Sequence, residues 1–426
     1  MKKLIFNFFL CILFLPVFAQ NDAFYIENYF RYDNYIYKDE VLTVDIYNQA
    51  DLLSYPVFYL GSEYKLIVNF DVLGNEQRNY SYKIIHCNAS WQPSDLFASE
   101  YIEGYEENNV WENVHSFNTS ADYIHYSFNL PNNDINITKS GNYLLKVYED
   151  YNEENVVFTR RFYVVDNKTE IQATVKQPTL PQYYFSGHEI DFTIKPSVNI
   201  SNPLEDLKIV ISQNGRTDNV ITGLTPTFIN DQQLTYDYNK ENVFPAGNEF
   251  RFFDLEDLKY RTEYIDSIYF QNPYYHVFLN KEYNSPNRPH NSWKDINGQR
   301  VLRCTFEENC QNESEYVYVN FYLPVENEII DGNIYVLGEL TDWQFTKRNL
   351  MIFNPERNAY ELTLMLKQGY YNYQYAIVKD QESAADITTI EGSTYETENN
   401  YLIFVYYCDL KNRYDELIGF QIFTKK

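Results

Sequence analysis

The chain has 426 residues and a formal net charge of −26, with 60 acidic against 34 basic side chains. This acidic balance disfavours nucleic acid as a partner, because a phosphate backbone repels an acidic surface. The 43 tyrosines and 30 phenylalanines are typical of half-buried β-strands, and 14 glycines are too few for a collagenous or linker-like chain. The length favours two or three domains over a single core.

Residues 1–19 have the pattern of a secretory signal peptide. Lys2 and Lys3 precede an apolar run from Leu4, and the run ends at Ala19. We therefore expect cleavage near Gln20 and a mature protein outside the cytoplasm. The later sequence contains no stretch of 18 or more apolar residues, so we expect no membrane span.

Period-two alternation predicts an all-β fold. Apolar and polar residues alternate from Tyr64 to Phe70 and again from Tyr360 to Leu366, as expected for strands with one buried face. The pairs Asn214-Gly215, Asn297-Gly298 and Asp331-Gly332 suit type I′ hairpin turns, so the sheets should be mainly antiparallel.

Polar stretches divide the chain into three predicted domains. One stretch follows Val165, and a second lies at Cys310 to Asn312. We predict consecutive β-sandwiches of an Ig-like or early-set-like kind over residues 20–167, 168–312 and 313–426. A short helix is expected after Pro93.

Histidine and cysteine offer little support for catalysis or metal binding. His86 beside Cys87 is the one pair worth considering as metal ligands or as base and nucleophile. Both lie in an alternating strand, so a packed strand end is the favoured interpretation. Familiar catalytic motifs are absent from the sequence, and we predict no catalytic residue, metal or cofactor.

The cysteines leave their pairing open. Cys11 would leave with the signal peptide, and Cys87, Cys304, Cys310 and Cys408 would remain. Four cysteines allow three full connectivities. The spacing of Cys304 and Cys310 permits a local disulfide, while free buried thiols are an equally good reading.

The C-terminal segment resembles the early-set β-sandwich of starch- and glycogen-binding modules. The resemblance rests on the stretches from Asn333 to Trp343 and from Leu366 to Tyr375. It implies an alternative function, an exported carbohydrate-binding accessory protein in which Trp343 stacks on sugar rings. We favour a core role for Trp343, because a shared fold does not carry a shared function.

A longer signature runs from Tyr236 to Asp254 and includes Phe244-Pro-Ala-Gly-Asn-Glu-Phe250. Further blocks accompany it along the chain: Ser81 to Asp95, Ser116 to Thr119, Gln213 to Arg216, Asp295 to Gly298, Glu391-Gly392 and Arg413 to Asp415. Together they resemble the plug protein of the type IX secretion system. Ala246 departs from the pattern, since a second glycine would be expected there.

The resemblance implies a non-enzymatic gatekeeper. Such a protein is periplasmic, associates peripherally with the outer membrane and binds the giant translocon β-barrel. It closes the periplasmic mouth of that barrel while no cargo is engaged. Partner-binding residues do not follow from the resemblance.

Residues of the signature blocks have a structural interpretation. Asn248, Glu249 and Arg251 are predicted to form a charge-assisted network that pins a turn, because arginine binds a carboxylate bidentately. Trp91 and Asp95 are predicted to cap the short helix and fill the end of the first domain.

Overall fold

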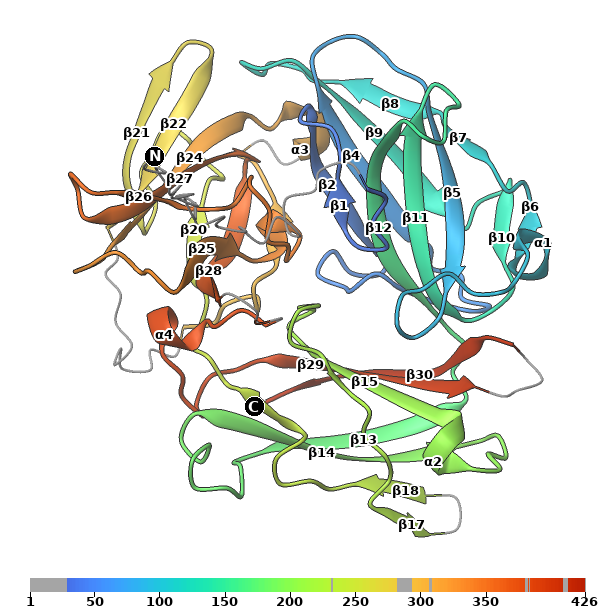
Figure 1. The fold of residues 1–426 in the computed structure, drawn as a ribbon. Helices are drawn as coiled ribbons and strands as arrows, with labels where there is room; N and C mark the ends of the chain where they lie inside the picture. Colours follow the sequence, from blue (N-terminus) through green and yellow to red (C-terminus); the bar gives the residue numbers. More distant parts are fainter. Residues whose placement is uncertain are drawn as a thin grey trace, which may run out of the picture.

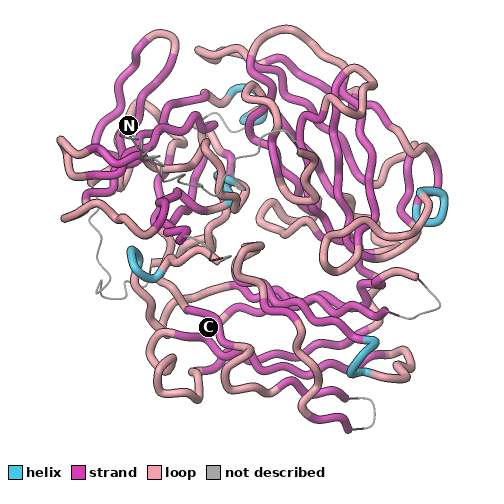
Figure 2. Tube along the Cα trace, in the orientation of Figure 1, coloured by secondary structure: helices cyan, strands magenta, loops and turns pink. Residues whose placement is uncertain are grey.

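The computed structural model describes residues 29–230, 233–281, 293–305, 309–379, 382, 384–408 and 413–425. The expected signal peptide lies outside the described residues. Strands dominate, and the helices are single turns (Figure 1, Figure 2). The prediction of a mainly antiparallel all-β protein is confirmed. Parallel pairing occurs between β3 (Val57–Tyr59) and β12 (Val156–Val165) and between β22 (Tyr274–Leu279) and β24 (Tyr316–Pro324). Within the described residues, no helix is both long enough and apolar enough to cross a membrane.

The first unit, residues 29–166, is a sandwich of two sheets. One sheet has the order β1 (Tyr35–Ile36), β12 (Val156–Val165), β11 (Gly141–Glu149), β5 (Tyr80–Cys87) and β7 (Asn108–Val110), with β3 (Val57–Tyr59) also on β12. The other has the order β2 (Val41–Asn48), β4 (Leu66–Leu73), β9 (Tyr123–Leu130) and β8 (Glu112–His115). A small pair, β6 (Ile102–Gly104) and β10 (Ile135–Ile137), lies beside α1 (Ala98–Tyr101).

Aromatic rings fill the core of the first unit. Phe70 stacks on Tyr126 with ring centroids 5.0 Å apart, and it meets Tyr80 and Phe158 edge-on at 5.2 and 5.1 Å. Such pairs add about 0.5–1.5 kcal/mol each beyond the burial of their area. The tyrosine-rich composition therefore builds the core as well as the surface.

The second unit, residues 167–247 and 393–425, is also a two-sheet sandwich. Its first sheet comprises β13 (Thr169–Lys176), β14 (Gly187–Pro196), β18 (Gln233–Tyr236) and β17 (Phe228–Asn230), with β19 (Val243–Pro245) on β14. Its second has the order β16 (Ile221–Thr222), β15 (Leu207–Gln213), β29 (Asn400–Cys408) and β30 (Asp415–Thr424), and α2 (Pro203–Asp206) precedes β15.

The third unit, residues 248–392, is inserted between the two parts of the second. One sheet has the order β21 (Ile265–Gln271), β22 (Tyr274–Leu279), β24 (Tyr316–Pro324), β27 (Ala359–Lys367) and β26 (Ile352–Asn354). The other comprises β20 (Arg251–Asp254), β28 (Gly369–Lys379) and β23 (Arg300–Leu302), with β25 (Gly332–Leu337) on β28. The short helices are α3 (Cys310–Glu313), the 3-10 turn η2 (Glu339–Thr341) and α4 (Thr388–Glu391).

This insertion corrects the predicted division into consecutive domains. β20 and β23 precede the predicted boundary at Asn312, yet both pair with β28 beyond it. β29 and β30, which were expected in the C-terminal domain, complete the sheet of β15. Alternation indicates which face of a strand is buried but not which strand lies beside it. The sequence pattern therefore could not predict that these strands pair across the expected domain boundary.

The predicted turns are only partly of the expected kind. Asn214-Gly215 and Asn297-Gly298 have positive φ at both residues, as a type I′ turn requires. Gly332 does not have a left-handed φ and already belongs to β25. Asp331-Gly332 is therefore the start of a strand rather than a type I′ turn.

Candidate functional site at the joints between the three units

The first and third units meet around the buried carboxylate of Asp71. On β4, Phe70 and Val72 belong to the core of the first unit, and Asp71 lies on the opposite face of the sheet. Its carboxylate accepts hydrogen bonds from Lys367 Nζ and the Tyr316 hydroxyl, both at 2.6 Å, and from His125 Nδ1 at 2.6 Å. The side chains of Asp71 and Lys367 are each 1% exposed. A face that an isolated sandwich would leave in water is thus covered by the third unit.

The charge of Asp71 is stabilised by its partners. Burial disfavours its ionised form, but the Lys367 ammonium and the His125 contact outweigh burial, and the pKa of Asp71 lies below its usual value. Lys367 Nζ also donates to the carbonyl of Gln311 in α3 and lies 4.5 Å from the ring centroid of Tyr123. The joint is therefore a hydrogen-bonded network rather than an isolated ion pair.

A second group of ion pairs links the same two units by exchange of arginines. Arg160 of the first unit bonds Asp342 of the third at 2.9 Å. Arg300 of the third unit bonds Asp45 of the first at 2.5 Å. Both guanidinium groups also donate to the carbonyl of Val44, at 3.4 and 3.2 Å. Movement of one unit away from the other would break both ion pairs and both bonds to Val44, which opposes hinge motion.

The first and second units are joined by apolar and polar contacts together. Tyr163 stacks on Phe404 with centroids 4.4 Å apart, and the Tyr406 hydroxyl donates to Asn142 at 2.7 Å. Asp415 accepts the backbone N–H of Ala89 at 2.8 Å. Asp415 belongs to the Arg413–Asp415 block and Ala89 to the Ser81–Asp95 block, so two distant signature blocks meet at this joint.

Trp91 and Asp95 do not have the predicted capping role. The Arg161 guanidinium lies over the Trp91 ring, 4.4 Å from the ring centroid, and Trp91 meets Tyr163 edge-on. The side chain of Asp95 is exposed. The residue before α1 is Phe97, whose N–H is bonded by the Glu100 carboxylate at 2.8 Å. Glu100 therefore satisfies a backbone N–H group at the start of α1. It lies three residues after Phe97, which is the spacing of the reciprocal contact in a capping box.

The signature residues Asn248, Glu249 and Arg251 lie at the joint between the second and third units. Arg251 Nε donates to both carboxylate oxygens of Glu391, at 3.0 and 2.9 Å. Asn248 donates to the Glu391 carbonyl at 3.1 Å, and Glu249 accepts the N–H of Glu398 at 3.0 Å. The bonds to Glu391 connect the start of the third unit with α4 near its end, and the bond to Glu398 crosses to the second unit, so the network reaches beyond a local turn.

Glu249 forms a carboxyl pair with Asp295 from another signature block. Burial, together with the nearby Asp295, raises the pKa of Glu249 to about 8. Asp295 accepts the N–H of Phe250 at 2.6 Å, and burial raises its pKa to about 6. A proton shared between the two groups avoids two adjacent buried charges.

Trp343 fills the core of the third unit. It is 8% exposed and meets Phe250 edge-on at 6.0 Å. Gly298 has a φ of +80°, and a Cβ there would lie 2.3 Å from Trp343 Cη2, so the turn at Asn297-Gly298 requires glycine. A ring packed in this way has no open face for a sugar, which supports the core role favoured from the sequence.

His86 and Cys87 are not arranged as a reactive pair. His86 Nδ1 bonds Ser94 Oγ at 2.8 Å and Nε2 bonds the Ser140 carbonyl at 3.1 Å, so both ring nitrogens are occupied. Burial lowers the pKa of His86 to about 4 and raises that of Cys87 to about 12. A buried neutral thiol is a poor nucleophile and a poor metal ligand.

One carboxylate cluster has the geometry of a cation site and already contains a cation. Glu189, Asp191 and Asp237 bring oxygen atoms within 4.8 Å of one another. The Lys176 ammonium pairs with all three, at 3.0 Å from Glu189 and 3.7 Å from Asp237. The lysine therefore offsets part of the negative charge of the three carboxylates.

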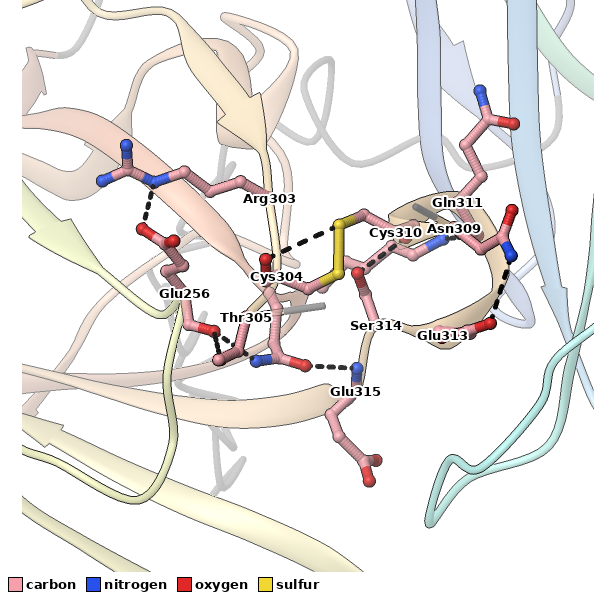
Figure 3. Close-up of a disulfide and its surroundings, with 12 residues drawn as sticks. Glu256, Arg303, Cys304, Thr305, Asn309, Cys310, Gln311, Glu313, Ser314 and Glu315 are labelled. Carbon is pink, nitrogen blue, oxygen red and sulfur yellow. Dashed lines mark hydrogen bonds and ion pairs between the residues drawn. A yellow bond between two sulfur atoms is a disulfide. The ribbon is translucent and has the colours of Figure 1, made fainter. Parts of the chain in front are cut away.

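A disulfide fixes the segment that docks on the first unit. Cys304 and Cys310 are bonded, with an S–S distance of 2.11 Å (Figure 3). Ser314, directly after α3, accepts the Tyr123 hydroxyl of the first unit through its carbonyl at 3.0 Å. Of the two readings left open by the sequence, the local disulfide is the one found, and Cys87 and Cys408 are free.

Comparison with known proteins identifies the family. Residues 41–166 match the family model for the first domain of the type 9 secretion system plug protein. The crystal structure of a hypothetical protein from Parabacteroides merdae is 34% identical with a TM-score of 0.90, covering 93% of this chain and 100% of that one.

A second solved structure, native alpha-2-macroglobulin from Escherichia coli spanning domains NIE-MG1, is only 10% identical with a TM-score of 0.16. It covers 41% of this chain and 80% of that one, and so carries no argument. No curated protein matches the chain. The sequence blocks, the family match and the three-unit fold agree, and the chain belongs to the type IX secretion system plug family.

Proposed function

We propose that this protein is a non-enzymatic plug that binds the outer-membrane translocon barrel of the type IX secretion system. It occludes the periplasmic opening of the barrel while no cargo is engaged. It is periplasmic and associates peripherally with the outer membrane. Family membership is the observation that carries the proposal.

The construction of the joints supports a mechanism based on steric occlusion. A body that closes a wide pore must keep its shape under thermal motion, whereas docked domains usually move relative to one another. Here the Asp71–Lys367 pair and the two exchanged arginines are buried between units. Separating the first and third units would break all three ion pairs, so these two sandwiches are held as one piece.

Reversible binding without turnover fits the surface chemistry. A net charge of −26 keeps the free protein soluble and limits self-association. His86 and Cys87 are buried, and both ring nitrogens of His86 are hydrogen-bonded, so the proposal gives this pair no chemical role.

Quantitative affinity purification tests the partner. The tagged mature chain, expressed in its native host, is isolated from gently solubilised envelopes, and co-eluting proteins are measured by mass spectrometry. We expect a barrel of translocon size in near-equal amount. Arg357→Met, which removes an exposed ion pair on the β26–β27 turn, serves as the matched control and should retain the partner. Reproducible absence of the barrel from intact envelopes would contradict the proposal.

A further inference from the structure

The chain between β23 and β24 contains a short docking element that a disulfide closes. This element, α3, is a single turn of four residues, and its first residue, Cys310, is bonded to Cys304 (Figure 3). Among the described residues, the side chain of Asn309 forms no capping bond at the start of the turn. One helical turn is unstable in water by itself, because it fixes several residues for very few hydrogen bonds. The shape of α3 therefore depends on its anchors and on the surface that it contacts.

The anchors of α3 are strands of the third unit. On the side of Cys304, β23 pairs with β28, and the Thr305 hydroxyl donates to the carbonyl of Glu256 at 2.9 Å. On the other side the chain enters β24, which pairs with β22 and β27. The disulfide ties the first residue of α3 to the first of these anchors. Opening it would free that end of α3 and leave the strand pairs of both sheets in place.

The residues from α3 to β24 contact the first unit. The carbonyl of Asn312 accepts the N–H of Phe117 at 2.8 Å. The Glu315 carboxylate accepts the N–H of Ser120 at 2.9 Å and its hydroxyl at 3.0 Å. A further bond comes from the Tyr123 hydroxyl. Three of these four donors lie in the loop between β8 and β9, so α3 is the part of the third unit that holds this loop.

The disulfide is open to thiol exchange on one side. Cys310 is half-buried, whereas Cys304 is only 4% exposed. A thiolate of a dithiol reductant attacks the Cys310 sulfur, the S–S bond breaks, and Cys304 leaves as a thiolate that takes up a proton. The second thiol of the reductant then displaces Cys310 as a thiol and closes the disulfide of the reductant. Two electrons pass to the protein, and a disulfide oxidant runs the same steps in reverse.

We propose that the Cys304–Cys310 disulfide is a redox-controlled latch on the joint between the first and third units. With the bond closed, α3 is docked on the loop between β8 and β9. With the bond opened by a dithiol, α3 leaves this loop while both sandwiches stay folded. The proposal goes beyond the proposed function and does not depend on it, because the joint can be measured on the isolated chain.

Hydrogen exchange on the mature wild-type chain tests the latch. Exchange is followed by mass spectrometry before and after native treatment with dithiothreitol, and thiol labelling records how much of the disulfide has opened. Reduction should speed exchange in residues 116–122 at least about tenfold, because the N–H groups of Phe117 and Ser120 lose their acceptors. Exchange in residues 317–321 of β24 and 402–406 of β29 should not change, since these residues are held by neighbouring strands.

Two variants assign the effect to this disulfide. Cys304→Ser combined with Cys310→Ser should show the fast exchange of the loop without any reductant and should not respond to dithiothreitol. Cys408→Ser is the matched control. It removes a free thiol of the second unit and keeps the disulfide, so it should respond to dithiothreitol like the wild type.

Three results would overturn the proposal. The first is a disulfide that dithiothreitol opens only after the chain has been unfolded, because a latch has to open in the folded protein. The second is unchanged exchange in residues 116–122 after complete reduction. The third is faster exchange throughout β24 and β28 on reduction, since the disulfide would then hold the third sandwich together. All three are measured on the wild-type chain and do not depend on a variant folding.

Discussion

Removing the Lys367 ammonium should destabilise the protein through the joint and not through a sandwich core. Lys367 and Asp71 are each 1% exposed and bonded at 2.6 Å. Loss of one partner from a buried pair costs about 3–5 kcal/mol, because the other charge stays buried without compensation. Asp71 keeps its bonds from His125 and Tyr316, so Lys367→Met should lower the free energy of unfolding by about 3 kcal/mol, the lower end of that range.

The double variant Asp71→Asn with Lys367→Met separates charge from packing. It removes both charges, and the amide that replaces the Asp71 carboxylate retains an oxygen that can accept a hydrogen bond. The loss of unfolding free energy in the double variant should therefore be smaller than the sum of the two single losses by at least about 1.5 kcal/mol. Urea unfolding followed by near-UV circular dichroism and by fluorescence gives the three values. A loss below about 1 kcal/mol for Lys367→Met, or additive single effects, would refute the reasoning.

The pH dependence of the same joint has a definite sign. The folded pKa of Asp71 is below its unfolded value of about 3.9, so its contribution is present above that value and is lost as the pH falls through the folded pKa. Asp71→Asn should remove that part of the acid destabilisation. An unchanged acid limb of the unfolding curve would show that Asp71 does not carry it.

Three further predictions concern the other joints and the core. Glu249→Gln should raise stability at pH 8 by at least about 1 kcal/mol and flatten the decline between pH 5 and 8. The folded pKa of Glu249 is about 8 and exceeds its unfolded pKa, so ionisation of Glu249 favours unfolding in that window. Thermal melts across this pH range measure the effect, and an unchanged slope of stability against pH in the variant would count against it. Cys304→Ser should lower the free energy of unfolding by about 2 kcal/mol. Thiol counting on the unfolded, unreduced wild-type mature chain should find Cys87 and Cys408 alone. Trp343→Ala should cost about 3–5 kcal/mol as a cavity in the core; loss of polysaccharide retention without destabilisation would instead favour the sugar-stacking role.

The sequence predicted strands well, because alternation is a local property. The segment from Tyr360 to Leu366 lies within β27, and the turn at Asn297-Gly298 has the two positive φ angles expected from its residues. Asp331-Gly332 is a turn-forming pair of the same kind, but a strand begins at Gly332, because turn residues permit a conformation without imposing it.

The joints lay beyond sequence reasoning for a physical reason. Asp71 occupies the polar face of an alternating strand, which in a single sandwich would face water. That face is buried because Lys367, almost 300 residues later in the chain, packs against it. The block at Glu391-Gly392 was a usable signal, since it supplies the carboxylate that Arg251 engages. Arg251 and Glu391 lie near the two ends of the inserted third unit, and no local sequence pattern places these ends together.

A leak assay tests the central claim most directly. Purified translocon is reconstituted into vesicles loaded with a small dye, and efflux is measured before and after addition of the mature chain. The account predicts that stoichiometric protein stops the efflux and that Lys367→Met, with its weakened joint between the first and third units, seals less completely than Arg357→Met. Unchanged efflux in the presence of bound wild-type protein would contradict occlusion as the function.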